Sequence, residues 1–289
     1  MKRIVFTVAT GAPRYAEMAL GLARSLGLIG DTTERVVMSD IADPNLARWF
    51  DRVVPPVATS FPYLRKLSAL ETTDADQVLF IDADSLAFGK LGPIFDYCHG
   101  KQLAVQGQIK SEGHWYGWLE RTLPRIGLDE IQQFNGGMIY YERSPETQRL
   151  FKEIANVAEH YEDTGLDTFR GHIPDEPCIA IGMGRSGVGE LIPNELDIMN
   201  TPVGLVGKLH LDVMKNECLF LKRADRMRLI RPVLFHAGKY VNNTLYWKQL
   251  SRLEMLDRYE QSHPYGRMSF GHKLRRSIER RILKLRGKL

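Results

Sequence analysis

The sequence lacks long hydrophobic runs and has few cysteines, and each absence excludes a class of protein. No segment approaches the roughly 18 to 20 consecutive apolar residues that a membrane-spanning helix needs. Cys98, Cys178 and Cys218 stand far apart and in no metal-type spacing, which argues against a cysteine-bound metal and favours reduced thiols in a cytoplasmic protein. Repeats and low-complexity linkers are also missing. The short apolar start, "RIVFTVATG", is expected to be a first strand rather than a signal core.

The net charge of +4 is concentrated in the last 19 residues. Residues 271–289 carry eight Lys and Arg and one Glu, whereas residues 1–270 carry 31 basic and 34 acidic residues. In a helix, this tail would align five apolar residues on one narrow face: Leu274, Ile278, Ile282, Leu285 and Leu289. We expect it to bind an anionic membrane surface, which makes the protein peripheral on the inner face of a membrane. The alternatives are a packed terminal helix, a solvated tail and a nucleic-acid arm, although no nucleic-acid partner is expected.

Apolar periodicity predicts alternating strands and helices in the first 90 residues. Strands are predicted over 3–11, 35–40 and 77–81, and helical faces over 15–26 and 63–70. This β-α-β-α-β order favours an α/β domain with a mostly parallel sheet. A further strand is predicted at 134–144, entered through a Gly-Gly turn and followed by a helix that begins at Pro145, and a late strand from residue 231 ends on His236.

Two aspartates end the apolar strand "QVLFI" at an informative spacing. Asp82 and Asp84 stand at i and i+2, so on an extended chain both carboxylates point to the same side. Because each negative charge raises the cost of ionising the other, the pair calls for a cation between them. Ligands of open α/β sheets bind at the carboxyl ends of the strands. Mg²⁺ or Mn²⁺ accepts carboxylate and phosphate oxygens, so the pair predicts a metal that holds a phosphate-bearing ligand.

Five segments, in order, resemble GT-A fold glycosyltransferases, and most closely those of glycosyltransferase family eight. They are "VATGAPRY", "FIDADS", "FNGGMIYY", "PDEPCIA" and "LFHAGKY", and from first to last they span most of the chain before the tail. The resemblance implies a Rossmann-like, mixed but mostly parallel sheet flanked by helices. It also implies a metal-dependent hexosyltransferase that uses a nucleoside diphosphate sugar, with UDP the expected nucleotide, and a saccharide or glycolipid acceptor.

The resemblance further implies roles for single residues. His236, at the end of an apolar strand, would be the third metal ligand beside Asp82 and Asp84, and a strand-end histidine bonded to backbone is the alternative. Two other residues also have a purely structural alternative: Lys66 as a surface lysine and Tyr15 as a core aromatic. The predicted nucleotide- and sugar-binding residues are Ala9, Thr10, Tyr15, Lys66, Ala83, Asn135, Gly136, Gly137, Gly238 and Lys239.

Asp175 and Glu176 follow Pro174 and are predicted to be catalytic, because the family's acidic stretch at this place faces the donor sugar. Family eight usually has Gln where this chain has Glu176. A glutamate near the acceptor could be a general base for inverting transfer. A retaining enzyme would instead use an acid or amide to stabilise oxocarbenium-like charge, and the resemblance favours retention. The aromatic residues of 114–118 are either sugar-stacking faces or part of a core-covering loop.

We expect residues 1–250 to form the nucleotide-sugar transferase domain and residues 251–289 a helical extension with the basic amphipathic tail. Two other functions compete with transfer. A haloacid-dehalogenase-like phosphatase would use Asp82 as nucleophile, but such enzymes place the motif on the first strand and follow it with Thr or Val rather than Ser85. A non-catalytic GT-A-like binding protein is the third hypothesis, and the complete set of ligand types argues against it.

Overall fold

A seven-stranded sheet in the order β3-β2-β1-β4-β7-β6-β8 forms the centre of the protein, in a computed structural model that describes residues 1–224 and 227–262. β7 runs antiparallel to both of its neighbours, and the other strands are parallel to one another. This confirms the predicted α/β class and the mostly parallel sheet. The strands are β1 (Arg3–Ala9), β2 (Glu34–Ser39), β3 (Arg52–Val54), β4 (Gln77–Ile81), β6 (Leu103–Lys110), β7 (Ile131–Glu142) and β8 (Glu190–Pro193).

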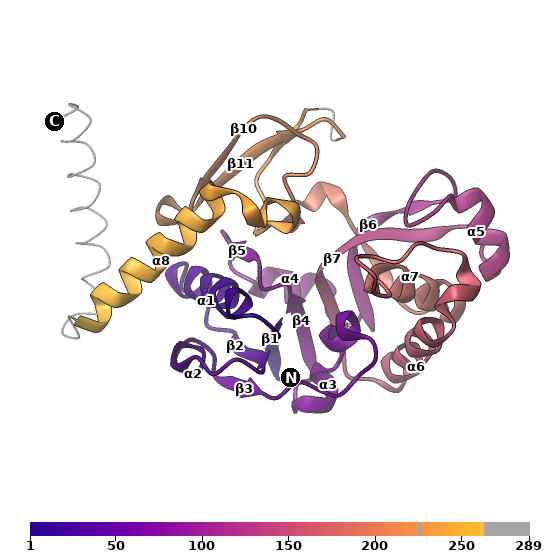
Figure 1. Ribbon diagram of the computed structural model, residues 1–289, viewed down its shortest axis with the longest axis horizontal. Coiled ribbons are helices and arrows are strands. Elements are labelled where there is room, and N and C mark those ends of the chain that lie inside the picture. The colour runs from indigo at the N-terminus through magenta and orange to yellow at the C-terminus, as the bar shows by residue number, and fades with distance from the viewer. Residues whose placement is uncertain (225–226, 263–289) are drawn as a thin grey trace.

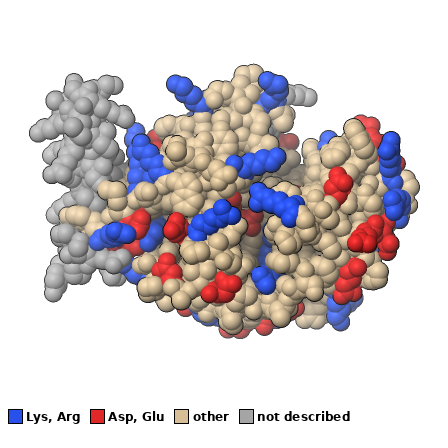
Figure 2. Space-filling view, in the orientation of Figure 1, with Lys and Arg blue, Asp and Glu red and all other residues tan. Residues whose placement is uncertain are grey.

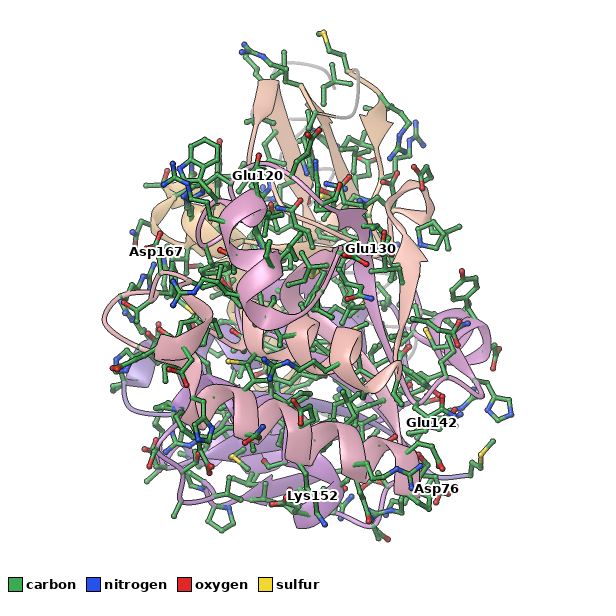
Figure 3. The ribbon with its side chains drawn as sticks, turned by 90° about the vertical axis from the view of Figure 1, so that its right-hand side faces the viewer. Asp76, Glu120, Glu130, Glu142, Lys152 and Asp167 are labelled. Carbon is green, nitrogen blue, oxygen red and sulfur yellow. The ribbon has the colours of Figure 1, made fainter. Side chains whose placement is uncertain are left out.

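Helices cover both faces of this sheet (Figure 1). One face packs against α1 and α4, and the opposite face against α5, α6 and α7. On the second side α6 and α7 lie one above the other, with α5 above them (Figure 3). The helices are α1 (Pro13–Leu28), α2 (Pro44–Trp49), α3 (Ala69–Thr72), α4 (Gly92–Cys98), α5 (Leu119–Ile126), α6 (Pro145–Glu159), α7 (Asp175–Ser186) and α8 (Thr244–Ser262).

The two-residue period of β4 decides which way its acidic extension faces. Val78 and Phe80 pack into the core under α6 and α7, whereas Leu79 and Ile81 pack into the core under α1 and α4. All four side chains are buried, so this central strand is apolar on both faces, as a strand between two helical layers must be. Asp82 comes next and continues the row of Val78 and Phe80, toward the side of α7.

Two small three-stranded sheets complete the fold. β5 (Ser85–Ala87) pairs with β13 (Leu234–His236), which also pairs with β9 (Met199–Asn200). The second sheet rises above the main one in Figure 1 and contains β10 (Leu205–Asp212), β11 (Glu217–Lys222) and β12 (Leu229–Ile230). The 3₁₀ turns are η1 (Pro62–Leu67), η2 (Tyr161–Thr164), η3 (Asn194–Leu196), η4 (Val213–Lys215) and η5 (Gly238–Asn242).

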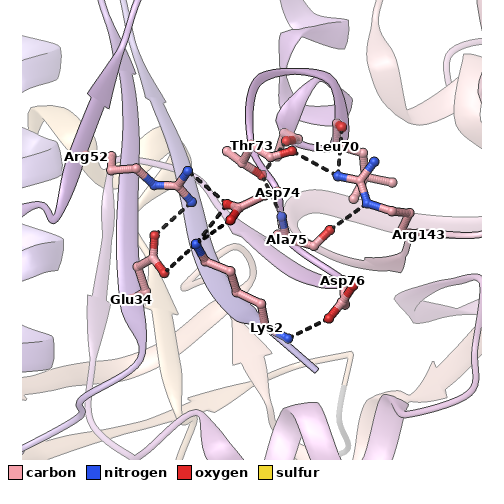
Figure 4. A network of polar contacts seen from close by, with 10 residues as sticks. Lys2, Glu34, Arg52, Leu70, Thr73, Asp74, Ala75, Asp76 and Arg143 are labelled. Atoms are coloured by element: carbon pink, nitrogen blue, oxygen red, sulfur yellow. Dashed lines mark hydrogen bonds and ion pairs between the residues drawn. The ribbon is translucent and has the colours of Figure 1, made fainter.

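A polar network fastens the amino ends of the central strands, at the end of the sheet opposite the aspartates (Figure 4). Lys2 Nζ lies 2.8 Å from Asp74 Oδ1 and 3.4 Å from Glu34 Oε2. Arg52 contacts both of these acids, at 3.1 and 2.7 Å. Arg143 donates to the backbone carbonyls of the turn before β4. These contacts join the amino ends of β1, β2, β3 and β4 to the end of β7. They therefore lie far from the strand ends that carry Asp82 and Asp84.

Helix α8 is tied to the sheet layer through one buried acid. Asp257, with a side chain only 1% exposed, accepts from Arg24 at 3.0 Å, from Arg48 at 2.6 Å and from Trp49 Nε1 at 2.9 Å. Arg24 lies on α1 and the other two partners on α2. The boundary predicted between residues 250 and 251 falls inside α8, and the division into two domains stays a prediction.

Two sequence expectations differ from the structure in detail. The glycines at 136 and 137 lie within β7 rather than in a turn before it. The helix predicted around residues 63–70 is a 3₁₀ turn, η1, followed by the short α3. Within the described residues, no helix is both long and apolar enough to cross a membrane. The predicted basic amphipathic helix at 271–289 lies outside the described residues.

Candidate metal centre and acidic pair

Asp82, Asp84 and His236 converge at the carboxyl end of β4. The two aspartates occupy the tight turn between β4 and β5, where the Ser85 N–H donates to the Asp82 carbonyl. Antiparallel pairing of β13 with β5 sets His236 opposite Ser85. As a result, Nε2 of His236 lies 3.1 Å from Asp84 Oδ1 and 3.6 Å from Asp82 Oδ2. One ligand atom from each residue falls within 4.8 Å of the others, so the three can hold one metal ion.

Asn135 determines which nitrogen of His236 faces the aspartates. Oδ1 of Asn135 accepts the Gly137 N–H at 3.1 Å, so this atom is the amide oxygen. The same oxygen lies 2.8 Å from His236 Nδ1, which must therefore carry a proton. In the neutral imidazole, Nε2 then presents its lone pair toward the aspartates, as a metal ligand requires. The sequence had predicted Asn135 as a sugar contact, and this geometry gives its amide oxygen to His236.

Glycines allow the backbone to close around the centre. A β-carbon on Gly137 would lie 2.4 Å from His236 Nδ1, so any side chain there would displace the imidazole. Gly238 has a φ of +52°, in the left-handed region, and its N–H donates to Asp84 Oδ2 at 2.9 Å. The missing β-carbon of Gly137 thus leaves room for the His236 ring, and the Gly238 N–H holds the Asp84 carboxylate.

Burial and the neighbouring charges shift the pKa values of all three residues of the centre. Burial raises the pKa of Asp82, and the neighbouring Asp84 and Asp175 raise it further against the opposing charges of Lys66 and His236. Burial raises the pKa of Asp84 as well. The imidazolium beside it and the Gly238 N–H outweigh burial, so the pKa of Asp84 lies below its ordinary value. Burial alone would lower the pKa of His236, yet Asp84 and Asp82 raise it to about 9. The charge of each of the three groups therefore depends on the charges of the other two.

Lys66 connects this centre to a second pair of acids. Its side chain is buried under η1, and Nζ lies 2.7 Å from Asp175 Oδ2 and 3.6 Å from Asp82 Oδ1. Nζ also donates to the Gly136 carbonyl at 2.9 Å and lies 4.8 Å from the centre of the Phe80 ring. Burial disfavours the charged ammonium, but Asp175 and Asp82 outweigh it and raise the lysine pKa. The alternative of a solvated surface lysine is therefore wrong.

Glu176 is held from two sides at the start of α7. The Gly136 N–H donates to Oε1 at 2.8 Å, and the Tyr116 hydroxyl donates to Oε2 at 3.0 Å. Burial and the adjacent Asp175 raise the pKa of Glu176 to about 7, so its charge changes near neutral pH. From the sequence, Tyr116 was expected to be a sugar-stacking face or part of a core-covering loop. No local pattern reports its contact, because 60 residues separate the two partners.

Within the part of the chain that the structure describes, five of the predicted residues make no polar contact with these acids: Ala9, Thr10, Tyr15, Ala83 and Lys239. Ala9, Ala83 and half-buried Tyr15 belong to the apolar cluster under α1 and α8. Thr10 follows β1, and its hydroxyl lies 3.4 Å from a guanidinium nitrogen of Arg65, next to Lys66 in the chain. Lys239 is exposed on η5. Their predicted contacts with nucleotide or sugar stay predictions.

A hollow of roughly 320 Å³ opens next to the loop that carries Tyr116. Its lining includes Gly117, the following residue, and the exposed ring of Trp118, which meets His114 edge to face at 5.5 Å. Polar groups from α5 and from the segment after η2 complete the lining: Arg121, Thr122, Arg125, Gly165 and Asp167. Exposed aromatic faces beside fixed polar groups suit a polar ligand with apolar faces.

Comparisons with known proteins identify the fold. No protein-family model and no curated protein matches the sequence. Among solved structures, the galactosyltransferase LgtC in complex with donor and acceptor sugar analogues aligns with a TM-score of 0.57 at 17% identity, covering 86% of this chain and 94% of LgtC. An active-site variant of LgtC aligns with a TM-score of 0.56 at 18% identity, covering 87% and 95%. This chain therefore has the GT-A fold of nucleotide-sugar glycosyltransferases.

Proposed function

We propose that the protein is a metal-dependent glycosyltransferase that moves a hexose from a nucleoside diphosphate, UDP in the first instance, to a saccharide or glycolipid acceptor. One observation carries this proposal. Within a GT-A fold, Asp82, Asp84 and His236 converge on one point, and Lys66 joins that point to the acidic pair Asp175 and Glu176. A cation site beside two partly buried acids suits transfer from a sugar diphosphate, because a cation can offset charge on the leaving diphosphate.

The residues present fit a divalent cation. Two carboxylates and one imidazole are ligands that Mn²⁺ accepts readily, and Mg²⁺ with more reliance on the carboxylates. The absence of a β-carbon at Gly137 makes room for the imidazole, and the Asn135 oxygen orients it. A cation would take the place that the Nε2 proton of His236 holds between Asp82 and Asp84. When bound, it supplies positive charge beside the departing diphosphate.

Two lysines would contact the two ends of the donor, its sugar and its diphosphate. Lys66 places a buried ammonium between the metal centre and Asp175, where it can meet the sugar. The exposed Lys239 follows Gly238 and can approach the diphosphate as a point charge. Basic side chains also lie across the middle of the face drawn in Figure 2, below the region of β10 and β11, and would favour the approach of an anionic donor.

Glu176 would face the reacting carbon or the acceptor. As a carboxylate near neutral pH it can stabilise positive charge on the sugar in retaining transfer, or accept the acceptor's proton in inverting transfer. We propose retention, on the resemblance to family eight. The hollow beside Trp118 would hold the saccharide of the acceptor, because its lining begins one residue from Tyr116.

The proposal is tested by the release of UDP from UDP-galactose and UDP-glucose, with Mn²⁺ and with a chelator. Transfer to water suffices as a readout, so the acceptor need not be known. Metal-dependent release that is lost in Asp82→Asn would support the transferase. Hydrolysis of p-nitrophenyl phosphate together with an acyl-phosphate trapped on Asp82 would favour the phosphatase. Nucleotide binding without any turnover would favour the non-catalytic protein.

A further inference from the structure

The loop that carries Tyr116 is held in an uncommon backbone conformation. Tyr116 has a φ of +56°, in a region that non-glycine residues rarely occupy. The conformation is kept by contacts on both sides: the Asp167 N–H donates to the Tyr116 carbonyl, and the Trp115 N–H donates to the Gly117 carbonyl at 2.8 Å. The ring of Tyr116 also packs edge to face on the buried Trp115, with centroids 5.5 Å apart. Strain maintained in this way tends to occur where a side chain must be aimed.

The strained backbone aims the phenol at one atom of the acidic pair. The Tyr116 hydroxyl donates to Oε2 of Glu176, while the Gly136 N–H donates to Oε1. Each carboxylate oxygen therefore has a donor of its own, and these donors come from different elements, a loop and β7. This arrangement suits an ionised carboxylate, which only accepts, better than a carboxylic acid, which must also donate a proton.

We propose that Tyr116 is the positioning residue of Glu176: its hydroxyl holds the carboxylate ionised and in one orientation beside the donor sugar. The proposal rests on the transferase function proposed above, although the contact itself can be tested without turnover. Four groups among the described residues act on the charge of Glu176 besides burial. Asp175 precedes it on α7, Lys66 approaches from η1, and the Gly136 amide and the Tyr116 hydroxyl donate to its oxygens. Asp175 opposes ionisation and the other three favour it.

Removal of the hydroxyl therefore has a predictable sign. A hydrogen bond to the charged form lowers the pKa of an acid, so without it the Glu176 carboxylate becomes harder to ionise. The loss of one bond to a charged group corresponds to about one pH unit or more. A hydroxyl that merely filled space would leave this equilibrium where it was.

The experiment is a pH titration of the Glu176 side chain, followed by the ¹³C shift of its carboxyl carbon in glutamate-labelled full-length protein. The signal is assigned with Glu176→Gln. We expect Tyr116→Phe to raise the midpoint by about one pH unit. The matched control is Tyr161→Phe, which also removes one phenol hydroxyl. The Tyr161 hydroxyl donates to the Asp167 carbonyl at 3.0 Å and not to Glu176. An unchanged midpoint in Tyr116→Phe overturns the proposal.

A second variant covers the case in which Tyr116→Phe fails to fold. Incorporation of 3,5-difluorotyrosine at position 116 keeps the ring and makes the hydroxyl a stronger donor, so the Glu176 midpoint should move down. A midpoint that stays or rises would contradict the proposed role. The acid limb of UDP release should shift in the same direction as the midpoint in each variant. Failure of UDP release in the unmodified protein, with the expected shifts of the midpoint, would reject the transferase function and leave the contact established.

Discussion

A β-carbon on Gly137 would lie 2.4 Å from Nδ1 of His236, closer than two such atoms can approach. The same β-carbon would lie 2.9 Å from Asn135 Oδ1, the atom that contacts Nδ1 and sets the orientation of Nε2. The centre thus depends on the absence of a side chain in the neighbouring strand. The proposed cation site needs its three ligands and also the space beside them.

Gly137→Ala is therefore expected to abolish Mn²⁺-dependent UDP binding while the protein stays folded. Alanine fits a strand backbone, so the loss would come from the displaced imidazole. Gly92→Ala is the matched control, because a β-carbon at Gly92 meets nothing within 4 Å. Calorimetry with UDP and circular dichroism on both variants provide the check. Retained binding in Gly137→Ala would show that the ring can move without loss of the site.

Lys66→Met should destabilise the protein by about 3 kcal/mol, because it leaves Asp175 and Asp82 without their buried countercharge. The apolar replacement keeps much of the stem volume and removes only the charge. Arg149→Ala breaks an exposed ion pair with Glu146 on α6, and is expected to cost less than about 1 kcal/mol. Urea denaturation at pH 8 measures both. Equal effects of the two substitutions would contradict a buried role for Lys66.

Glu176→Gln should stabilise the protein at pH 8. The folded pKa of Glu176, about 7, lies above its ordinary value of 4.5, so the folded state binds more protons than the unfolded state between these values. Stability therefore falls as the pH rises through this window, by up to about 3 kcal/mol, and the neutral amide avoids that loss.

The gain from Glu176→Gln should disappear at pH 4, where the glutamate is protonated in both states. Urea denaturation of the two proteins at pH 4 and pH 8 gives the comparison. A difference in stability that is independent of pH would mean that the carboxylate is not penalised by burial in the folded protein.

Asp257→Ala should cost about 3 kcal/mol, because it leaves the buried guanidinium of Arg24 without its partner and removes the polar contacts of α8 with α1 and α2. The control is Glu254→Gln on the same helix, where the acid pairs with Arg258 on the surface. Thermal unfolding reports the difference. A small effect of Asp257→Ala would imply that α8 contributes little to the fold and would favour a domain boundary near residue 250.

The parts of the site that the sequence predicted are those encoded by neighbours in the chain. Asp82 and Asp84 stand two residues apart after an apolar strand, so period and position predicted that both face one point, and the resemblance to family eight added His236. For Lys66 the sequence left two interpretations open, a ligand contact and a surface lysine, because its burial depends on η1 packing over β7. The contact of Tyr116 with Glu176 joins a loop to a helix, and no periodic pattern reports such a pair.

The measurement that tests the account most directly is a calorimetric titration of the protein with UDP and with GDP, each with and without Mn²⁺, repeated on Asp84→Asn. The account predicts micromolar binding of one nucleotide, UDP in the first instance, that requires both the metal and Asp84. Binding that survives a chelator or the Asp84→Asn substitution would contradict it, and so would the failure of both nucleotides to bind in the presence of Mn²⁺.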